Sequence, residues 1–270
     1  MTLMNTTNQE SDDFFRFPHK FTILANICTS LNILFGLWGI IVSLEGTAEA
    51  IRLAYRLLLI GSVFDLIDGG IAKKAPNPAR FWRSFGIYAD SFADLITFAL
   101  LPGFLVVNAG IFFTDVILIE NLLTAEVLIG GIYALGGWYR LIRFSSKPSG
   151  VTFEGLPSPS AAMLAGILIM FALDVKEIQG LCGILIAVIG LLMVSPIEYP
   201  SPKRMFTSDT RLILVAVVVG AFYVLVPNII SAFALLFITV LYTIAGPLYL
   251  RETYKRHAKE QQEKPTAVES

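Results

Sequence analysis

Four aspartates between positions 65 and 94 are the residues of this sequence whose types and spacing best suit chemistry. Asp65 and Asp68 are three residues apart, and Asp90 and Asp94 are four residues apart. On helices these spacings place each pair on one face. The flanking residues are apolar enough to enter a membrane, where an ionised aspartate costs on the order of 3 kcal/mol. Divalent cations offset such a cost, so we expect the four carboxylates to bind one or two Mg²⁺ or Mn²⁺ ions.

Divalent cations bound in this way suit phosphoryl transfer, because they stabilise negative charge on the non-bridging oxygens of a pyrophosphate. The alternative is the proton or cation relay of a transporter, or a structural ion site, since intramembrane aspartates serve these purposes too. Gly69, Ala72 and Gly86 share the carboxylate faces and allow a ligand or another backbone to approach closely. Glycines at these offsets favour the phosphoryl-transfer enzyme.

This arrangement of aspartates and small residues resembles the signature of the CDP-alcohol phosphotransferases, which are helical integral membrane enzymes. They transfer a phosphatidyl-type group from a CDP-linked lipid to an alcohol. The resemblance implies that the four aspartates bind metal and that Asp94 also takes the proton from the acceptor hydroxyl. There are two departures from the family pattern. Lys73 stands where the family usually has Arg, and the gap from Lys73 to Gly86 is about one helical turn longer.

A second set of residues is expected to bind the nucleotide of the CDP-lipid. Some belong to the signature, some form a polar stripe on the first apolar segment, and some are basic or polar residues between the aspartate pairs. They are Asn26, Thr29, Gly69, Ala72, Lys73, Arg83, Ser84 and Gly86. The alternative for the polar stripe is hydrogen bonding between helices, and the alternative for the basic residues is the usual excess of positive charge on the cytoplasmic side.

Three further stretches resemble the phosphatidylserine synthase branch of the family: RLIRF followed by FEGLPSPSAA, then LLMVSPIEYPSPK, and DSFADLITFALLP. This resemblance implies CDP-diacylglycerol and L-serine as substrates, although inositol, inositol phosphate or glycerol phosphate stay open as acceptors. The residues that we expect near the acceptor are Arg140, Arg143, Gly155, Pro157 and Ser158. The two arginines also suit anchoring at the membrane interface, and the Gly-Leu-Pro-Ser turn either binds an anion through its N–H groups or only sets the chain direction.

The composition of the chain indicates a polytopic membrane protein. Of its 270 residues 55% are hydrophobic and 15% are charged, and the mean hydropathy is +0.70. The net charge of −1, without a basic domain, gives no reason to expect a nucleic-acid partner. Cys28 and Cys182 lie in apolar runs at unrelated spacing and are expected to be packed thiols, and the two histidines lie near the termini, which argues against a histidine-based site.

We therefore expect an all-α helical bundle with about eight transmembrane segments, which position the aspartates. The segments are 21–44, 48–73, 84–110, 122–145, 158–174, 178–195, 211–227 and 229–250. They make up a membrane-embedded catalytic domain over 18–250, between a polar leader at 1–17 and a charged tail at 251–270. All but three of the 20 Lys and Arg residues would fall on one side, so both termini and the active site should face the cytoplasm. From the family resemblance we also expect a homodimer. We expect it to contact membrane lipids and to lie in the cell membrane of a prokaryote.

Overall fold

The computed structural model describes residues 18–74, 80–112, 117–119, 123–146 and 152–200, and near the C-terminus residues 220–221, 223–225, 230, 232–241, 243–244 and 247. Most of the described chain is helical. The α-helices are α2 (Lys20–Ser43), α3 (Ala48–Ala72), α4 (Arg80–Asp94), α5 (Leu101–Ala109), α6 (Ala125–Ser146), α7 (Ser158–Asp174) and α8 (Gln179–Val194). A π-helix, Leu95–Leu100, joins α4 to α5, and a 3-10 turn, Lys176–Ile178, precedes α8.

Two short antiparallel strand pairs complete the described fold, and neither was predicted. β1 (Ile117–Ile119) pairs with β2 (Leu123–Thr124), and β3 (Thr152–Glu154) pairs with β4 (Glu198–Pro200). The expected fourth helix therefore begins at Ala125 and not at 122, because residues 123–124 are taken up by β2.

The helical character predicted for the first six segments is confirmed, with small shifts at their ends. The segment predicted at 211–227 lies largely outside the described residues. The leader at 1–17 and the tail at 251–270 lie wholly outside them. Within the segment predicted at 229–250, the described part includes a short apolar helix, Ala232–Leu241.

Three helices in the described part of the chain are long and apolar enough to cross a membrane. They are Lys20–Ser43, Phe81–Ala109, which runs through α4, the π-helix and α5, and Lys176–Val194. Large apolar side chains point outward from the first and the last of them, including Ile41, which is 65% exposed, and Leu191, which is 61% exposed. Apolar surface of this extent fits a lipid environment, so the protein is an integral membrane protein with a helical core.

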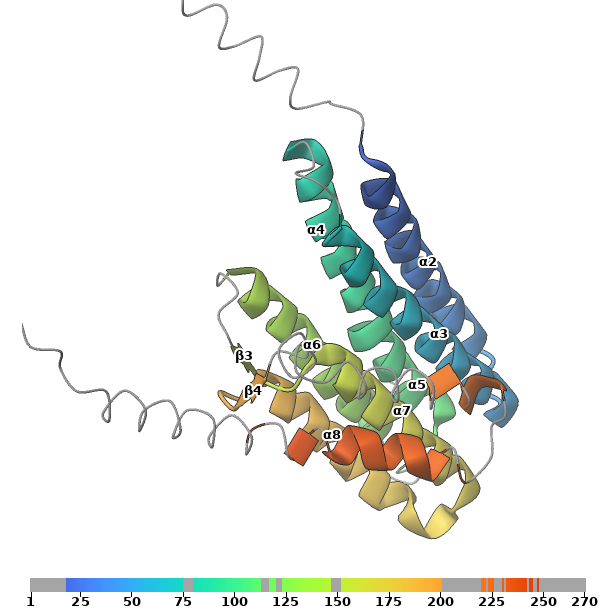
Figure 1. Ribbon diagram of the computed structural model, residues 1–270. Coiled ribbons are helices and arrows are strands. Elements are labelled where there is room, and N and C mark those ends of the chain that lie inside the picture. Colours follow the sequence, from blue (N-terminus) through green and yellow to red (C-terminus); the bar gives the residue numbers. More distant parts are fainter. Residues whose placement is uncertain are drawn as a thin grey trace, which may run out of the picture.

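Helix α2 packs against both α3 and α4 (Figure 1). The start of α2, the end of α3 and the start of α4 meet at one end of the molecule, away from α7 and α8. Helix α6 packs against α5 and α8. The first predicted aspartate pair therefore lies near the end of α3 and the second in the last turns of α4, on two helices that both pack against α2.

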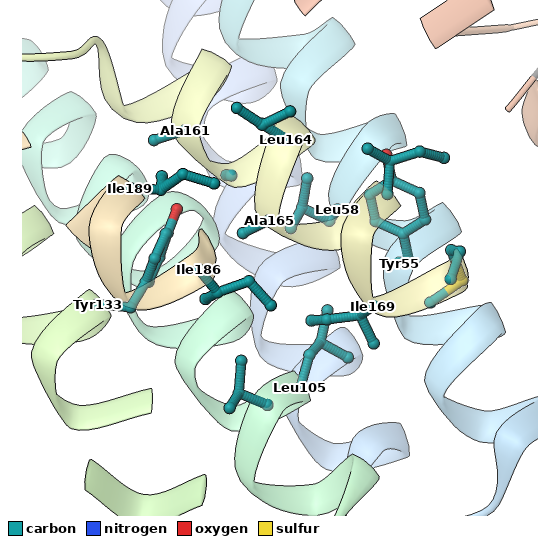
Figure 2. Packing of buried hydrophobic residues seen from close by; sticks show 14 of the residues in the cluster. Tyr55, Leu58, Leu105, Tyr133, Ala161, Leu164, Ala165, Ile169, Ile186 and Ile189 are labelled. Atoms are coloured by element: carbon teal, nitrogen blue, oxygen red, sulfur yellow. The ribbon is translucent and has the colours of Figure 1, made fainter. Parts of the chain in front are cut away.

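Helix α3 is fixed by the apolar core. The core members labelled in Figure 2 are Tyr55, Leu58, Leu105, Tyr133, Ala161, Leu164, Ala165, Ile169, Ile186 and Ile189. The ring of Tyr55 lies directly against Gly166 of α7, where an added Cβ would collide with it, and the Tyr55 hydroxyl donates to the Met163 carbonyl at 3.1 Å. Arg52 and Asp174 form an ion pair at 2.6 Å between the same two helices. These contacts hold the helix of the first aspartate pair in place.

The π-helix after Asp94 is clamped from both sides. Thr97 is fully buried, and its hydroxyl donates to the Asn32 carbonyl of α2 at 3.2 Å. From α6, the Tyr133 hydroxyl donates to the Phe98 carbonyl at 3.1 Å. A π-helical turn changes the direction in which the residues on either side of it face, and such turns often adjoin functional sites. Here the turn fixes where the helix carrying the second aspartate pair lies relative to α2 and α6.

Candidate active site

Three aspartates form a cluster that could hold a metal ion. Asp65 and Asp68 come from α3 and Asp90 comes from α4, and one carboxylate oxygen from each lies within 4.8 Å of the others. Asp68 is buried, Asp65 is half-buried and Asp90 is exposed. The i, i+3 spacing on α3 places both of its carboxylates toward α4. Three carboxylates from two helices are the donor set that Mg²⁺ or Mn²⁺ prefers, so these residues fit a divalent cation.

Thr29 of α2 holds the buried member of the cluster. Its hydroxyl lies 2.6 Å from Asp68 Oδ2 and 3.1 Å from the Ala25 carbonyl. A hydroxyl has a single proton, and the shorter contact, to an ionised acceptor, is the stronger of the two. Thr29 and Asp68 are both 4% exposed, so water contributes little to this contact. The hydroxyl therefore orients the Asp68 carboxylate toward the cluster, as partners of metal ligands commonly do.

Asp94 lies beside the cluster and not within it. Its carboxyl group is in hydrogen-bonding reach of the Asp65 carboxyl, and it also interacts electrostatically with Asp90 and with Arg140 of α6. Its Oδ1 atom is buried and has no hydrogen-bond partner among the described residues. Buried carboxylate oxygens are usually hydrogen-bonded, so this atom could accept a hydrogen bond from a bound ligand.

A cavity of about 410 Å³ opens between α2, α3 and α4 and includes Asp68 and Asp90 in its wall. Seven of the eight residues predicted to bind nucleotide also line it: Asn26, Thr29, Gly69, Ala72, Lys73, Arg83 and Gly86. The eighth, Ser84, is exposed and is not part of the lining. An added Cβ on Gly69 would meet no atom within 4 Å, which shows that this glycine faces open space. Residues far apart in sequence thus line one cavity beside the carboxylates.

The cavity also contains residues that the sequence did not point to, chiefly Thr22 and Trp82. Thr22 precedes Asn26 by four residues, so helical periodicity would have placed it on the same face as the polar stripe. Trp82 precedes Gly86 by four residues and so lies on the same face of α4, but the segment predicted at 84–110 began too late to include it.

Arg140 and Arg143 have different surroundings. The Arg140 guanidinium donates to the Ser158 hydroxyl at 2.7 Å and interacts electrostatically with Asp94. Arg143 forms an ion pair with Glu154. Of the two arginines, Arg140 is therefore the one associated with the second aspartate pair, and Arg143 joins α6 to the β3 strand.

The turn from Gly155 to Ser158 sets the direction of the chain. Gly155 has φ of +84°, and an added Cβ would collide with the Met193 carbonyl. Its N–H donates to the Ile197 carbonyl at 2.8 Å, and the Leu156 N–H donates to the Leu192 carbonyl at 3.1 Å. These two N–H groups are therefore not available to an anion, and the alternative of a turn that sets chain direction fits them. Pro157 is buried at the start of α7.

The same turn joins two of the stretches that resemble the phosphatidylserine synthase branch. β3 pairs with β4 in the register Thr152 to Pro200, Phe153 to Tyr199 and Glu154 to Glu198. Burial raises the pKa of the Tyr199 phenol above its usual value, so this side chain stays neutral in the pairing. The two stretches thus form one unit that supports the start of α7, and with it Ser158.

Comparison with known proteins agrees with this geometry. Residues 22–194 match the family model described as CDP-alcohol phosphatidyltransferase. The chain belongs to this family. It is 30% identical over 190 residues to the archaetidylserine synthase of Methanothermobacter thermautotrophicus, an alignment that covers 70% of this chain and 74% of that protein.

Two further relatives carry the same kind of name. The CDP-diacylglycerol–serine O-phosphatidyltransferase of Methanocaldococcus jannaschii is 29% identical over 202 residues, which cover 74% of this chain and 86% of the relative. The enzyme of the same name from Bacillus subtilis is 31% identical over 155 residues, which cover 57% of this chain and 78% of the relative. The expected family is thus confirmed.

Proposed function

We propose that this protein transfers the phosphatidyl group of CDP-diacylglycerol to the hydroxyl group of L-serine and releases CMP. The observation that carries the proposal is the three-aspartate cluster in the wall of a large cavity, in a chain of the CDP-alcohol phosphatidyltransferase family. The three relatives described above are named for serine transfer or for archaetidylserine synthesis, which supports serine as the acceptor.

The carboxylates of Asp65, Asp68 and Asp90 would hold one or two Mg²⁺ or Mn²⁺ ions. Asp94, beside this cluster, is proposed as a further ligand on the family resemblance alone. Ions bound there would neutralise the charge of the pyrophosphate of CDP-diacylglycerol. Thr29 keeps Asp68 directed at this position. With the ions bound at the carboxylates, the rest of the cavity beside Asp68 and Asp90 would hold the nucleotide.

The basic lining of the cavity adds to phosphate binding. Lys73, directly after α3, and Arg83, on α4, lie in its wall. Lys73 acts as a point charge and lacks the fork of an arginine, whereas Arg83 can bind two phosphate oxygens at once. The two residues together would provide what the family usually obtains from the single Arg of its signature.

Asp94 is the residue that we assign as the base. Its buried Oδ1, which has no partner among the described residues, accepts the proton of the serine hydroxyl. The serine oxygen then forms a bond to the phosphorus on the diacylglycerol side, and the bond from that phosphorus to the oxygen of CMP breaks. CMP leaves with the electron pair of that bond, so no covalent enzyme intermediate is required.

Arg140 gives the site a preference for an anionic acceptor. It faces Asp94 and is positioned by its hydrogen bond to Ser158. A serine whose hydroxyl lies at Asp94 would direct its carboxylate toward this guanidinium, which suits carboxylate geometry. Inositol has no negative charge to offer there, whereas inositol phosphate and glycerol phosphate do, so these two are the acceptors that must be tested against serine.

The arrangement in the membrane is part of the proposal. Eight spanning segments in one domain over 18–250, with both termini and the active site facing the cytoplasm, follow from the hydropathy and from the Lys and Arg distribution. The homodimer is proposed from the family resemblance, and the prokaryotic cell membrane from the organisms of the three relatives described above. A fusion of a reporter to each terminus, tested for cytoplasmic location, checks the orientation.

The acceptor is tested by supplying purified protein with CDP-diacylglycerol, Mg²⁺ and either serine, inositol, inositol phosphate or glycerol phosphate. We expect phosphatidylserine, identified by mass, and an equal amount of CMP with serine alone. A lipid product from another acceptor would contradict the assignment to serine. A transporter that uses the same aspartates would not return CDP-diacylglycerol from CMP and phosphatidylserine, whereas the enzyme does.

A further inference from the structure

We propose that Thr22 and Trp82 recognise the nucleobase of the CDP-lipid at the end of the cavity farthest from the metal-binding aspartates. The Thr22 hydroxyl hydrogen-bonds to the polar edge of the pyrimidine, and the Trp82 indole stacks on its face. The inference rests on the proposed function, because it takes a cytidine nucleotide as the ligand.

The position of Thr22 on α2 marks one end of the cavity. Thr29, which bonds to Asp68, marks the other end, where the pyrophosphate would lie. Thr29 follows Thr22 by seven positions, which is about 10 Å along a helix axis. Asn26 lies between them on the same face and also lines the cavity. A nucleotide with its phosphates at Asp68 therefore extends its sugar past Asn26 and its base toward Thr22.

The hydroxyl of Thr22 is a buried polar group that needs a ligand. Thr22 is only 7% exposed, it lines the cavity, and its Oγ1 has no hydrogen-bond partner among the described residues. Buried hydroxyl groups are normally hydrogen-bonded, as that of Thr29 is here. A threonine hydroxyl can both donate and accept, and the edge of a pyrimidine offers both kinds of partner.

Trp82 lies near the start of α4, at the end of the molecule where α2 also begins (Figure 1). It lies in the first turn of α4, it lines the cavity, and it is half-buried. Its ring makes edge contacts with Phe81, at 5.2 Å between ring centroids, and with Phe85, at 6.2 Å. Aromatic stacking on a base is strong and does not depend on which base is bound.

The two residues thus have separable roles, which a binding experiment on the full-length protein in detergent can resolve. CMP and UMP are titrated in the presence of Mg²⁺ by calorimetry and by tryptophan fluorescence. Thr22→Val keeps the shape of the side chain and should weaken CMP binding by about two- to tenfold, while Thr22→Ser restores it. Trp82→Leu should weaken CMP and UMP binding alike, by about five- to hundredfold. Thr22→Val should instead reduce the preference for CMP over UMP.

Two controls complete the design. Tyr88→Ala removes an aromatic side chain of α4 that is 75% exposed and does not line the cavity, so CMP binding should not change. Trp82→Phe keeps an aromatic ring and should retain most of the CMP affinity, but it should lose the fluorescence change that CMP causes in the unmodified protein. If Trp82 and Thr22 only supported the fold, their replacement would change neither the fluorescence response to CMP nor the ratio of CMP to UMP affinity.

The outcomes separate this inference from the proposed function. If the unmodified protein forms phosphatidylserine but Thr22→Val and Trp82→Leu bind CMP as it does, the inference is wrong and the proposed function stands. A fluorescence change that persists in Trp82→Phe also contradicts the inference. If the unmodified protein neither binds CMP nor forms phosphatidylserine, both are wrong. Should Trp82→Leu fail to fold, Trp82→Phe and the Thr22 variants, which preserve shape, still decide.

Discussion

Replacing Thr29 with valine removes the hydroxyl that orients Asp68 and leaves a side chain of nearly the same shape. The hydroxyl lies 2.6 Å from Asp68 Oδ2, and both residues are 4% exposed, so water cannot readily take its place. A hydrogen bond to a charged group contributes about 1.5–3 kcal/mol, which is about a 10- to 150-fold change in an equilibrium constant. Loss of a partner that orients a metal ligand typically costs about 10- to 100-fold in metal affinity or activity. We therefore expect Thr29→Val to raise the Mg²⁺ concentration needed for half-maximal activity by about 10- to 100-fold.

The assay follows CMP release from CDP-diacylglycerol and serine over a Mg²⁺ series. Thr29→Ser should behave like the unmodified protein, because it keeps the hydroxyl. Thr239→Val is the matched control, since that threonine is buried and bonds to backbone carbonyls of its own helix. If Thr29→Val needs no more Mg²⁺ than the unmodified protein, Asp68 is not positioned by Thr29 and the geometric argument fails.

Three further predictions concern the base, the nucleotide and the turn. Asp94→Asn should lower kcat by about 10²- to 10⁴-fold while CMP affinity is retained, and loss of CMP binding that excess Mg²⁺ restores would make Asp94 a metal ligand only. Lys73→Ala should raise the KM for CDP-diacylglycerol and Lys73→Arg should not, and an unchanged KM in Lys73→Ala would assign phosphate binding to Arg83. Gly155→Ala should lower the free energy of unfolding by about 1–3 kcal/mol, because Gly155 has φ of +84° and a methyl group would collide with the Met193 carbonyl. Thermal melts in detergent measure this, with Gly131→Ala, which meets no atom within 4 Å, as the control that should not be destabilised.

The parts of the site that depend on helical periodicity could be predicted from the sequence. The spacing of Asp65 and Asp68 put both on one face of a helix, and Gly69 and Ala72 follow on the same side of α3. When two helices pack, the residues on their facing sides come together, so knowing the face of each residue is enough to predict which residues meet. This is why most of the cavity lining was anticipated, although the side chain of Ser84 points elsewhere.

The parts that depend on contacts between distant segments could not be predicted. β3 and β4 are three residues each, too short for a period-two pattern to stand out, and they pair across the whole of α7 and α8. The ion pair of Arg143 with Glu154 follows from that pairing and was therefore not anticipated. The π-helix after Asp94 was not anticipated either, and the hydrogen bonds that hold it come from the distant helices α2 and α6.

The central claim is that carboxylates of this chain support the metal-dependent attack of the serine hydroxyl oxygen on the phosphatidyl phosphorus. The most direct test supplies serine labelled with heavy oxygen in its hydroxyl group to metal-stripped protein, with CDP-diacylglycerol, before and after Mg²⁺ is added. We predict no product before the addition, and afterwards phosphatidylserine with the label in its phosphodiester and none in CMP. Unlabelled phosphatidylserine, or full turnover in excess chelator, would contradict the account.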